Sequence, residues 1–126
     1  MKKLYIIVCL LAFISNVSYA HEMTPTYPKW KYSFLDNLLV TEMEMFNKRA
    51  DVEYYEIAVF DENWNPIPFV SSYKVYKVEY LSRVGFEVYI REKDKDRVEY
   101  ICSKSKLRDD GRSQTSISST ICSRLK

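Results

Sequence analysis

The sequence is poor in histidine, glycine and cysteine, and these shortages exclude several kinds of catalytic site. Its 126 residues contain one histidine, His21, so no second imidazole can complete a metal triad or act as the base beside a serine. The two glycines, Gly85 and Gly111, belong to no glycine-rich phosphate loop or Gly-x-Ser-x-Gly elbow. We therefore predict that the protein is not an enzyme and has no catalytic residues, metal or cofactor.

Long apolar runs are confined to the N-terminus. Two lysines precede an apolar run at residues 4–14, and small residues occupy both cleavage-site positions, Ser18 and Ala20. This is the pattern of a secretory signal peptide, and the run is too short to span a bilayer. We therefore expect residues 1–20 to be removed and residues 21–126 to form a single periplasmic or secreted domain without stable membrane insertion.

An excess of one charge is also missing. Lys2 and Lys3 belong to the expected leader, whereas all 17 Asp and Glu follow it, so residues 21–126 are formally neutral. Cations gather only in residues 104–126, where they predict a solvated basic edge. An exported chain with balanced charge is a poor candidate for nucleic-acid binding.

Two cysteines remain after the leader, Cys102 and Cys122. An even pair in a small exported domain is usually a disulfide. Closing a loop of about 20 residues should stabilise the fold by about 3 kcal/mol on the chain-entropy estimate. The two cysteines are too far apart for a CxxC redox motif, and no further Cys or paired His makes a zinc site.

The sequence is rich in Tyr, Val, Ile, Phe and Thr, the residues that favour β-strands. Residues 52–60, 85–92 and 97–105 alternate in hydrophobicity. The side chains expected to share a face in the first two are Tyr55, Ile57, Val59, Phe86, Val88 and Ile90. The polar run EKDKD predicts a hairpin turn, so we expect 85–92 and 97–105 to form an antiparallel pair.

Two further segments are less regular. Residues 71–81 predict a loose or edge strand. In residues 33–46, a period of two places Leu39, Met43 and Met45 on one face, whereas a period of 3.6 gives a helical stripe interrupted by a glutamate. The β-rich surroundings favour the strand.

The last segment, residues 115–126, alternates as well. Its Ile117, Ile121 and Leu125 share one face with serines. Asp-Gly turn chemistry precedes it, so we expect a hairpin with residues 97–105 that the disulfide staples. Six or seven short strands with evenly spaced turns predict an all-β fold, an antiparallel immunoglobulin-like β-sandwich of about seven strands.

Two runs of the sequence resemble a known family. Residues 38–69, LLVTEMEMFNKRADVEYYEIAVFDENWNPIPF, combine a strand, an Asn-containing turn, a Tyr-rich strand and an acidic turn with proline. Residues 85–105, GFEVYIREKDKDRVEYICSKS, continue the pattern. Over about residues 38–126 the chain resembles the N-terminal immunoglobulin-like domain of periplasmic pilus-assembly chaperones of the chaperone–usher type.

This resemblance implies a function in pilus or fimbria assembly with a pilin-like protein partner. In the family, the last strand of this domain lends alternating apolar side chains to an incomplete pilus subunit by strand addition. The matching residues here are Ile117, Ile121 and Leu125. Two family cations also clamp the subunit's terminal carboxylate. Arg124 matches one of them, and Lys31, or alternatively Lys29, matches the other.

Three other interpretations stay open. The apolar side chains of the last strand can instead pack into the protein's own core. A small exported protein-binding domain, such as a periplasmic inhibitor or immunity protein, would use a surface rich in aromatic residues. The candidates for that surface are Tyr54, Trp64, Tyr73, Tyr76 and Tyr80. A copper site would depend on His21, which the expected cleavage makes the first residue.

Overall fold

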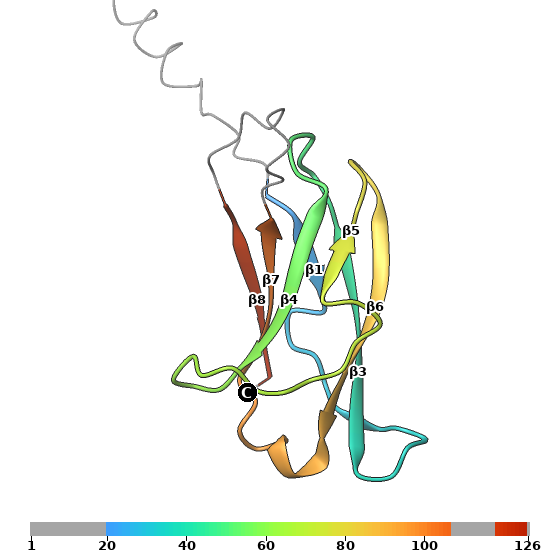
Figure 1. The fold of residues 1–126 in the computed structure, drawn as a ribbon, viewed down its shortest axis with the longest axis vertical. Helices are drawn as coiled ribbons and strands as arrows, with labels where there is room; N and C mark the ends of the chain where they lie inside the picture. The colour runs from blue at the N-terminus through green and yellow to red at the C-terminus, as the bar shows by residue number, and fades with distance from the viewer. Residues whose placement is uncertain (1–19, 107–117, 126) are drawn as a thin grey trace, which may run out of the picture.

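The computed structural model describes residues 20–106 and 118–125, and this part contains eight strands and one short 3-10 helix (Figure 1). The strands are β1 (Glu22–Thr24), β2 (Lys31–Tyr32), β3 (Leu38–Phe46), β4 (Tyr54–Phe60), β5 (Val75–Lys77), β6 (Arg83–Arg91), β7 (Tyr100–Lys106) and β8 (Thr120–Arg124). The helix η1 (Glu92–Asp94) lies between β6 and β7. Residues 1–19 of the expected leader, and Ile117, lie outside the described residues.

The strands form two antiparallel sheets that face each other. In the first sheet β6 pairs along the whole of β3, so β1 and β2 share the other edge of β3 as two parts of one interrupted strand. The second sheet has the order β5-β4-β7-β8. Counting β1 and β2 as one strand gives seven, and the predicted antiparallel immunoglobulin-like sandwich is confirmed. Among the described residues, no helix has the length and apolar character needed to cross a membrane.

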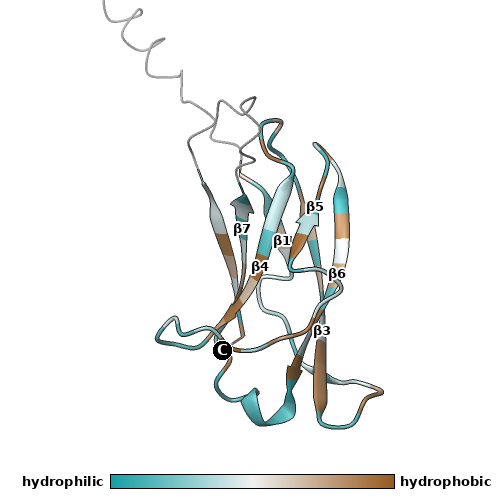
Figure 2. Cartoon of the chain, viewed as in Figure 1, coloured by the Kyte–Doolittle hydropathy of each residue, from teal (hydrophilic) through white to brown (hydrophobic). Residues whose placement is uncertain are grey.

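The core lies between the sheets and is built from alternate residues of the long strands. The predicted faces of β4 and β6 are buried in it, namely Tyr55, Ile57, Val59, Phe86, Val88 and Ile90. Residues 33–46 contain a strand, β3, and Leu39, Met43 and Met45 face the core as the period of two predicts. Figure 2 shows the alternation along β6 and the hydrophilic turn around η1. The predicted edge strand in 71–81 is the short β5.

The predicted pairing of residues 85–92 with 97–105 is wrong. β6 pairs with β3, whereas β7 pairs with β4 and β8, so the two strands lie in different sheets. The polar run between them crosses from one sheet to the other through η1. The buried carboxylate of Asp94 holds this crossing, because it accepts hydrogen bonds from Arg91 Nε at 2.7 Å and Arg97 Nη1 at 3.1 Å. Alternation identified the buried face of β6 but not the strand that pairs with it.

Asn47 follows β3 and joins three segments of the chain. Its side chain is fully buried, and Nδ2 donates to the carbonyl oxygens of Val52 at 2.7 Å and of Val78 at 2.8 Å. Its Oδ1 accepts hydrogen bonds from the backbone N–H of Arg49 and from the hydroxyl of Tyr55. One amide therefore satisfies four polar groups where the turn after β3 meets β4 and the segment after β5.

Candidate functional site

The predicted partner-binding strand is β8, the outer strand of the second sheet. It pairs with β7 in a register that places Cys102 opposite Cys122, and a disulfide joins the two residues across a Cα–Cα distance of 4.1 Å. The predicted hairpin and its disulfide are therefore confirmed. The covalent bond fixes the register of β8 at the edge of the sheet.

Part of the outer edge of β8 is open. The N–H of Arg124 points away from β7 and donates to the carbonyl oxygen of Thr26 at 3.0 Å. Because the direction of main-chain groups alternates along a strand, those of Thr120 and Cys122 also point outward. Within residues 20–106 and 118–125, no hydrogen bond covers the outward groups of these two residues. The N-terminal segment thus closes only the last part of the edge.

The predicted donor side chains face the seam between β8 and residues 21–26. Ile121 and Leu125 are half-buried and pack against the core. Between them, Ser123 is buried and donates its hydroxyl to the carbonyl oxygen of Pro25 at 2.8 Å. Because both apolar side chains keep part of their surface exposed, core packing and donation to a partner both stay predictions for them. The third predicted donor, Ile117, lies outside the described residues.

The two predicted clamp cations lie in different sheets. Arg124 ends β8, and its Nε donates to Oε1 of the buried Glu99 at 2.9 Å. This hydrogen bond raises the pKa of Arg124, so a partner's carboxylate would compete with Glu99 for the guanidinium. Lys31 is exposed on β2 in the first sheet. Sequence reasoning missed Glu99 because 25 residues separate it from Arg124.

His21, on which a copper site would depend, is buried. Its Nε2 lies 2.7 Å from Ser103 Oγ, its Nδ1 lies 3.2 Å from Ser119 Oγ, and its ring centroid lies 4.4 Å from that of Tyr55. Burial lowers the pKa of His21 to about 4, opposed by a hydrogen bond to the backbone of Ser103 and aided by the charge of Arg49. Both ring nitrogens therefore have protein partners. In the described part of the chain, no three metal-ligating side chains come together.

Acidification is expected to destabilise the fold through His21. The ordinary pKa of histidine is about 6.5, so the unfolded chain binds its proton at a higher pH than the folded chain does. The stability that the neutral imidazole contributes is complete above about pH 6.5 and falls by about 3 kcal/mol as the pH drops to about 4. Denaturant unfolding of wild type and His21→Gln at pH 7 and pH 4 checks this.

The wild type should lose about 3 kcal/mol more than His21→Gln between these two pH values, since glutamine does not titrate there. Carboxylates that titrate in the same range act on both proteins and cancel in the comparison. Equal losses would mean that the pKa of His21 is the same in the folded and in the unfolded chain.

The aromatic surface expected for a binding domain is only partly present. Trp64, Tyr73 and Tyr80 are each more than half exposed, and Trp64 stacks on Tyr100 with ring centroids 4.2 Å apart. Tyr76, however, is buried, which corrects the expectation that it belongs to the surface. It forms part of a groove between β5 and β6 that sequence reasoning did not identify, because the two strands belong to different sheets.

Comparison with known proteins supports the fold. No protein-family model matches the sequence, and no curated protein sequence matches it. Among solved structures, the E. coli chaperone DraB is similar to this chain with a TM-score of 0.56 and 14% sequence identity, over 85% of this chain. The chain spans about half of the length of DraB, 53%. At this level of identity the similarity shows that the chain shares the sandwich fold of DraB.

Proposed function

We propose that the protein is an exported chaperone-like or accessory factor in pilus assembly that binds partner subunits by strand addition along β8. Two observations support the proposal: the fold shared with the chaperone DraB, and the resemblance of residues 38–126 to the first domain of pilus-assembly chaperones. Periplasmic or secreted localisation belongs to the same proposal and rests on the leader pattern of residues 1–20.

The observation that carries the proposal is the open part of the β8 edge. Thr120 and Cys122 present outward main-chain donors and acceptors there, and the half-buried Ile121 lies between them. In strand addition, main-chain hydrogen bonds supply affinity and alternate side chains select the partner. The Cys102–Cys122 bond favours this use, because an edge already fixed in register loses less conformational freedom on binding.

Thr120→Pro is expected to weaken subunit binding strongly while the protein still folds. Proline removes the outward N–H of residue 120, but the hydrogen bonds of β8 to β7 involve the neighbouring positions. We would produce the tagged protein in a periplasm together with a pilin-type subunit, and measure how much subunit co-purifies. The recovery with Thr120→Pro should be at least tenfold lower than with wild type.

Thr120→Val is the matched control, because it keeps the N–H and the β-branched shape of the side chain. It should recover the subunit as wild type does. Equal recovery by wild type, Thr120→Pro and Thr120→Val would place recognition away from β8. If the wild type recovers no pilin-type subunit, the assembly role fails, and a purified exported toxin or hydrolase becomes the partner to test for an inhibitor role.

A further inference from the structure

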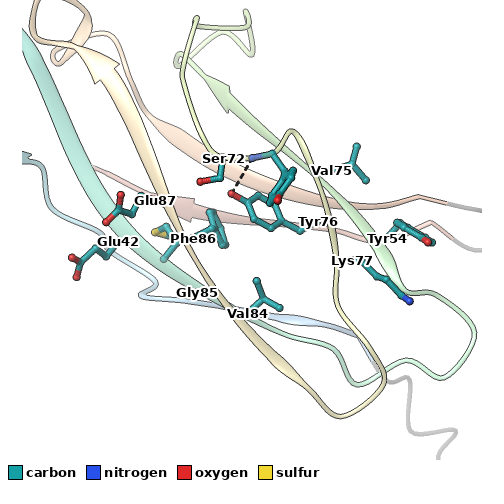
Figure 3. A pocket seen from close by; sticks show the side chains of 12 residues that line it. Glu42, Tyr54, Ser72, Val75, Tyr76, Lys77, Val84, Gly85, Phe86 and Glu87 are labelled. Atoms are coloured by element: carbon teal, nitrogen blue, oxygen red, sulfur yellow. Dashed lines mark hydrogen bonds between the residues drawn. The ribbon is translucent and has the colours of Figure 1, made fainter. Parts of the chain in front are cut away.

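The side of the sandwich opposite β8 holds an open apolar groove. β5 and β6 are the edge strands of the two sheets on this side (Figure 1). The groove between them has a volume of about 850 Å³. Figure 3 shows the side chains that line it. Phe86 and Tyr76 meet inside it, with ring centroids 5.2 Å apart. At its rim, Val75 is 40% exposed and Tyr73 is 66% exposed. On the β8 side, by contrast, His21 and Met23 of the N-terminal segment are buried.

Main-chain groups of β6 point into this opening. On the edge of β6 away from β3, Tyr89 exchanges two hydrogen bonds with Val70, at 2.9 and 2.8 Å, and Ser71 Oγ donates to Glu87 O at 2.7 Å. By alternation, the N–H of Glu87 and both main-chain groups of Gly85 point to the same edge. Among the described residues, none donates to or accepts from these three groups. The antiparallel bridge between Val70 and Tyr89 is therefore not continued toward Gly85 by any described residue.

Two carboxylates lie beside the open edge without a matching cation. Glu42 of β3 is directly opposite Glu87 of β6 on the exposed face of the first sheet, and Figure 3 shows the two side chains next to each other. Like charges in this arrangement repel. No ion pair joins either one to a cation of the described ranges. Gly85 leaves the neighbouring surface open, because a Cβ there would meet nothing closer than Met43 O at 3.9 Å.

We propose that this edge binds an extended segment of another protein in which apolar residues alternate with lysine or arginine. Paired with Gly85 and Glu87, such a strand would place its apolar side chains beside Val84 and Phe86 in the groove, since side chains of a strand alternate between faces. Its cations would lie on the exposed face next to Glu87 and Glu42 and remove their repulsion. The protein would thus carry a second strand-binding edge, separate from β8.

A fluorescein-labelled nine-residue peptide that alternates valine with lysine tests this inference on the exported chain. Fluorescence polarisation should show saturable binding, and the NMR amide signal of Gly85 should shift on titration. That signal is easy to assign because the chain has two glycines. A matched peptide with glutamate in place of lysine should bind at least tenfold more weakly, because its charge repels Glu42 and Glu87.

Two substitutions at Gly85 separate edge pairing from other binding. Gly85→Pro removes the outward N–H and leaves the hydrogen bonds of Val84 and Phe86 to β3 in place. The lysine peptide should therefore bind to this variant at least tenfold more weakly than to wild type. Gly85→Ala keeps the N–H, has room for its methyl group, and should bind within twofold of wild type. If Gly85→Pro does not fold, the double variant Glu42→Gln/Glu87→Gln serves instead and should lose the preference for the lysine peptide.

Three results would overturn the proposal: no binding of the lysine peptide to wild type, equal affinity for the two peptides, or unchanged binding by Gly85→Pro. A concentration-dependent dimer of the wild type that Gly85→Pro abolishes would also overturn it, because a second copy would then occupy the edge. Thr120→Pro should leave peptide binding unchanged. The outcome here is therefore independent of the function proposed for β8.

Discussion

Replacing Asn47 with alanine is expected to lower the free energy of unfolding by about 4 kcal/mol. The substitution leaves the buried carbonyl oxygens of Val52 and Val78 and the N–H of Arg49 without their partner, and the hydroxyl of Tyr55 loses its acceptor. Each buried polar group without a partner costs about 1–3 kcal/mol. Urea or guanidinium unfolding at pH 7 measures the loss.

Asn63→Ala is the control for this measurement. Asn63 is exposed in the turn after β4. Its backbone N–H donates to Asp61 Oδ1, and among the described residues its side chain has no hydrogen-bond partner. Its replacement should change the free energy of unfolding by less than about 0.5 kcal/mol. A loss below about 1 kcal/mol for Asn47→Ala would show that water replaces the amide at little cost, and that the four hydrogen bonds do not hold the segments together.

Removing the disulfide is expected to lower the free energy of unfolding by about 3 kcal/mol, through the double variant Cys102→Ala/Cys122→Ala or by reduction. The bond joins residues 20 positions apart and restricts the unfolded chain. Its loss should also act locally, because β8 is an edge strand that pairs along its length with β7 alone and contacts Thr26 only at its end. Amides of β8 should then exchange with solvent deuterium faster than those of β4 in the middle of the sheet.

A reducing agent supplies the control. Wild type should become less stable by the same amount when it is reduced, whereas the double variant should not respond. If reduction changes the unfolding free energy by less than about 1 kcal/mol, the non-covalent contacts of β8 are sufficient to keep it in place. Equal exchange rates in β8 and β4 after reduction would likewise contradict the local effect.

Local alternation predicted the strands well because every second side chain of a strand faces the core. Tyr55, Ile57 and Val59 of β4 are buried as expected, and so are the corresponding residues of β6. The neighbour of β6 was not predictable in the same way. Its connection to β7 reads as a polar hairpin loop, and only the structure reveals that Asp94 is buried between Arg91 and Arg97.

The candidate sites show the same limit. The disulfide was predictable, because two cysteines in an expected exported domain leave few alternatives. The burial of His21 was not, since its partners Ser103 and Ser119 lie 82 and 98 residues away. The groove between β5 and β6 depends on which edges remain unpaired, and alternation within a single strand contains no information about that.

The seam between residues 21–26 and β8 has a consequence for the order of folding. His21 and Ser119 are 98 residues apart in the chain, and so are Pro25 and Ser123. Contacts over such separations form late, because the entropy of closing a long loop must be overcome first. In a chain delivered N-terminus first, residues 21–26 have to wait for nearly the whole domain before the sandwich can close. Late closure of this kind leaves the chain open until residues 119–123 are available, as the export that we propose for it requires.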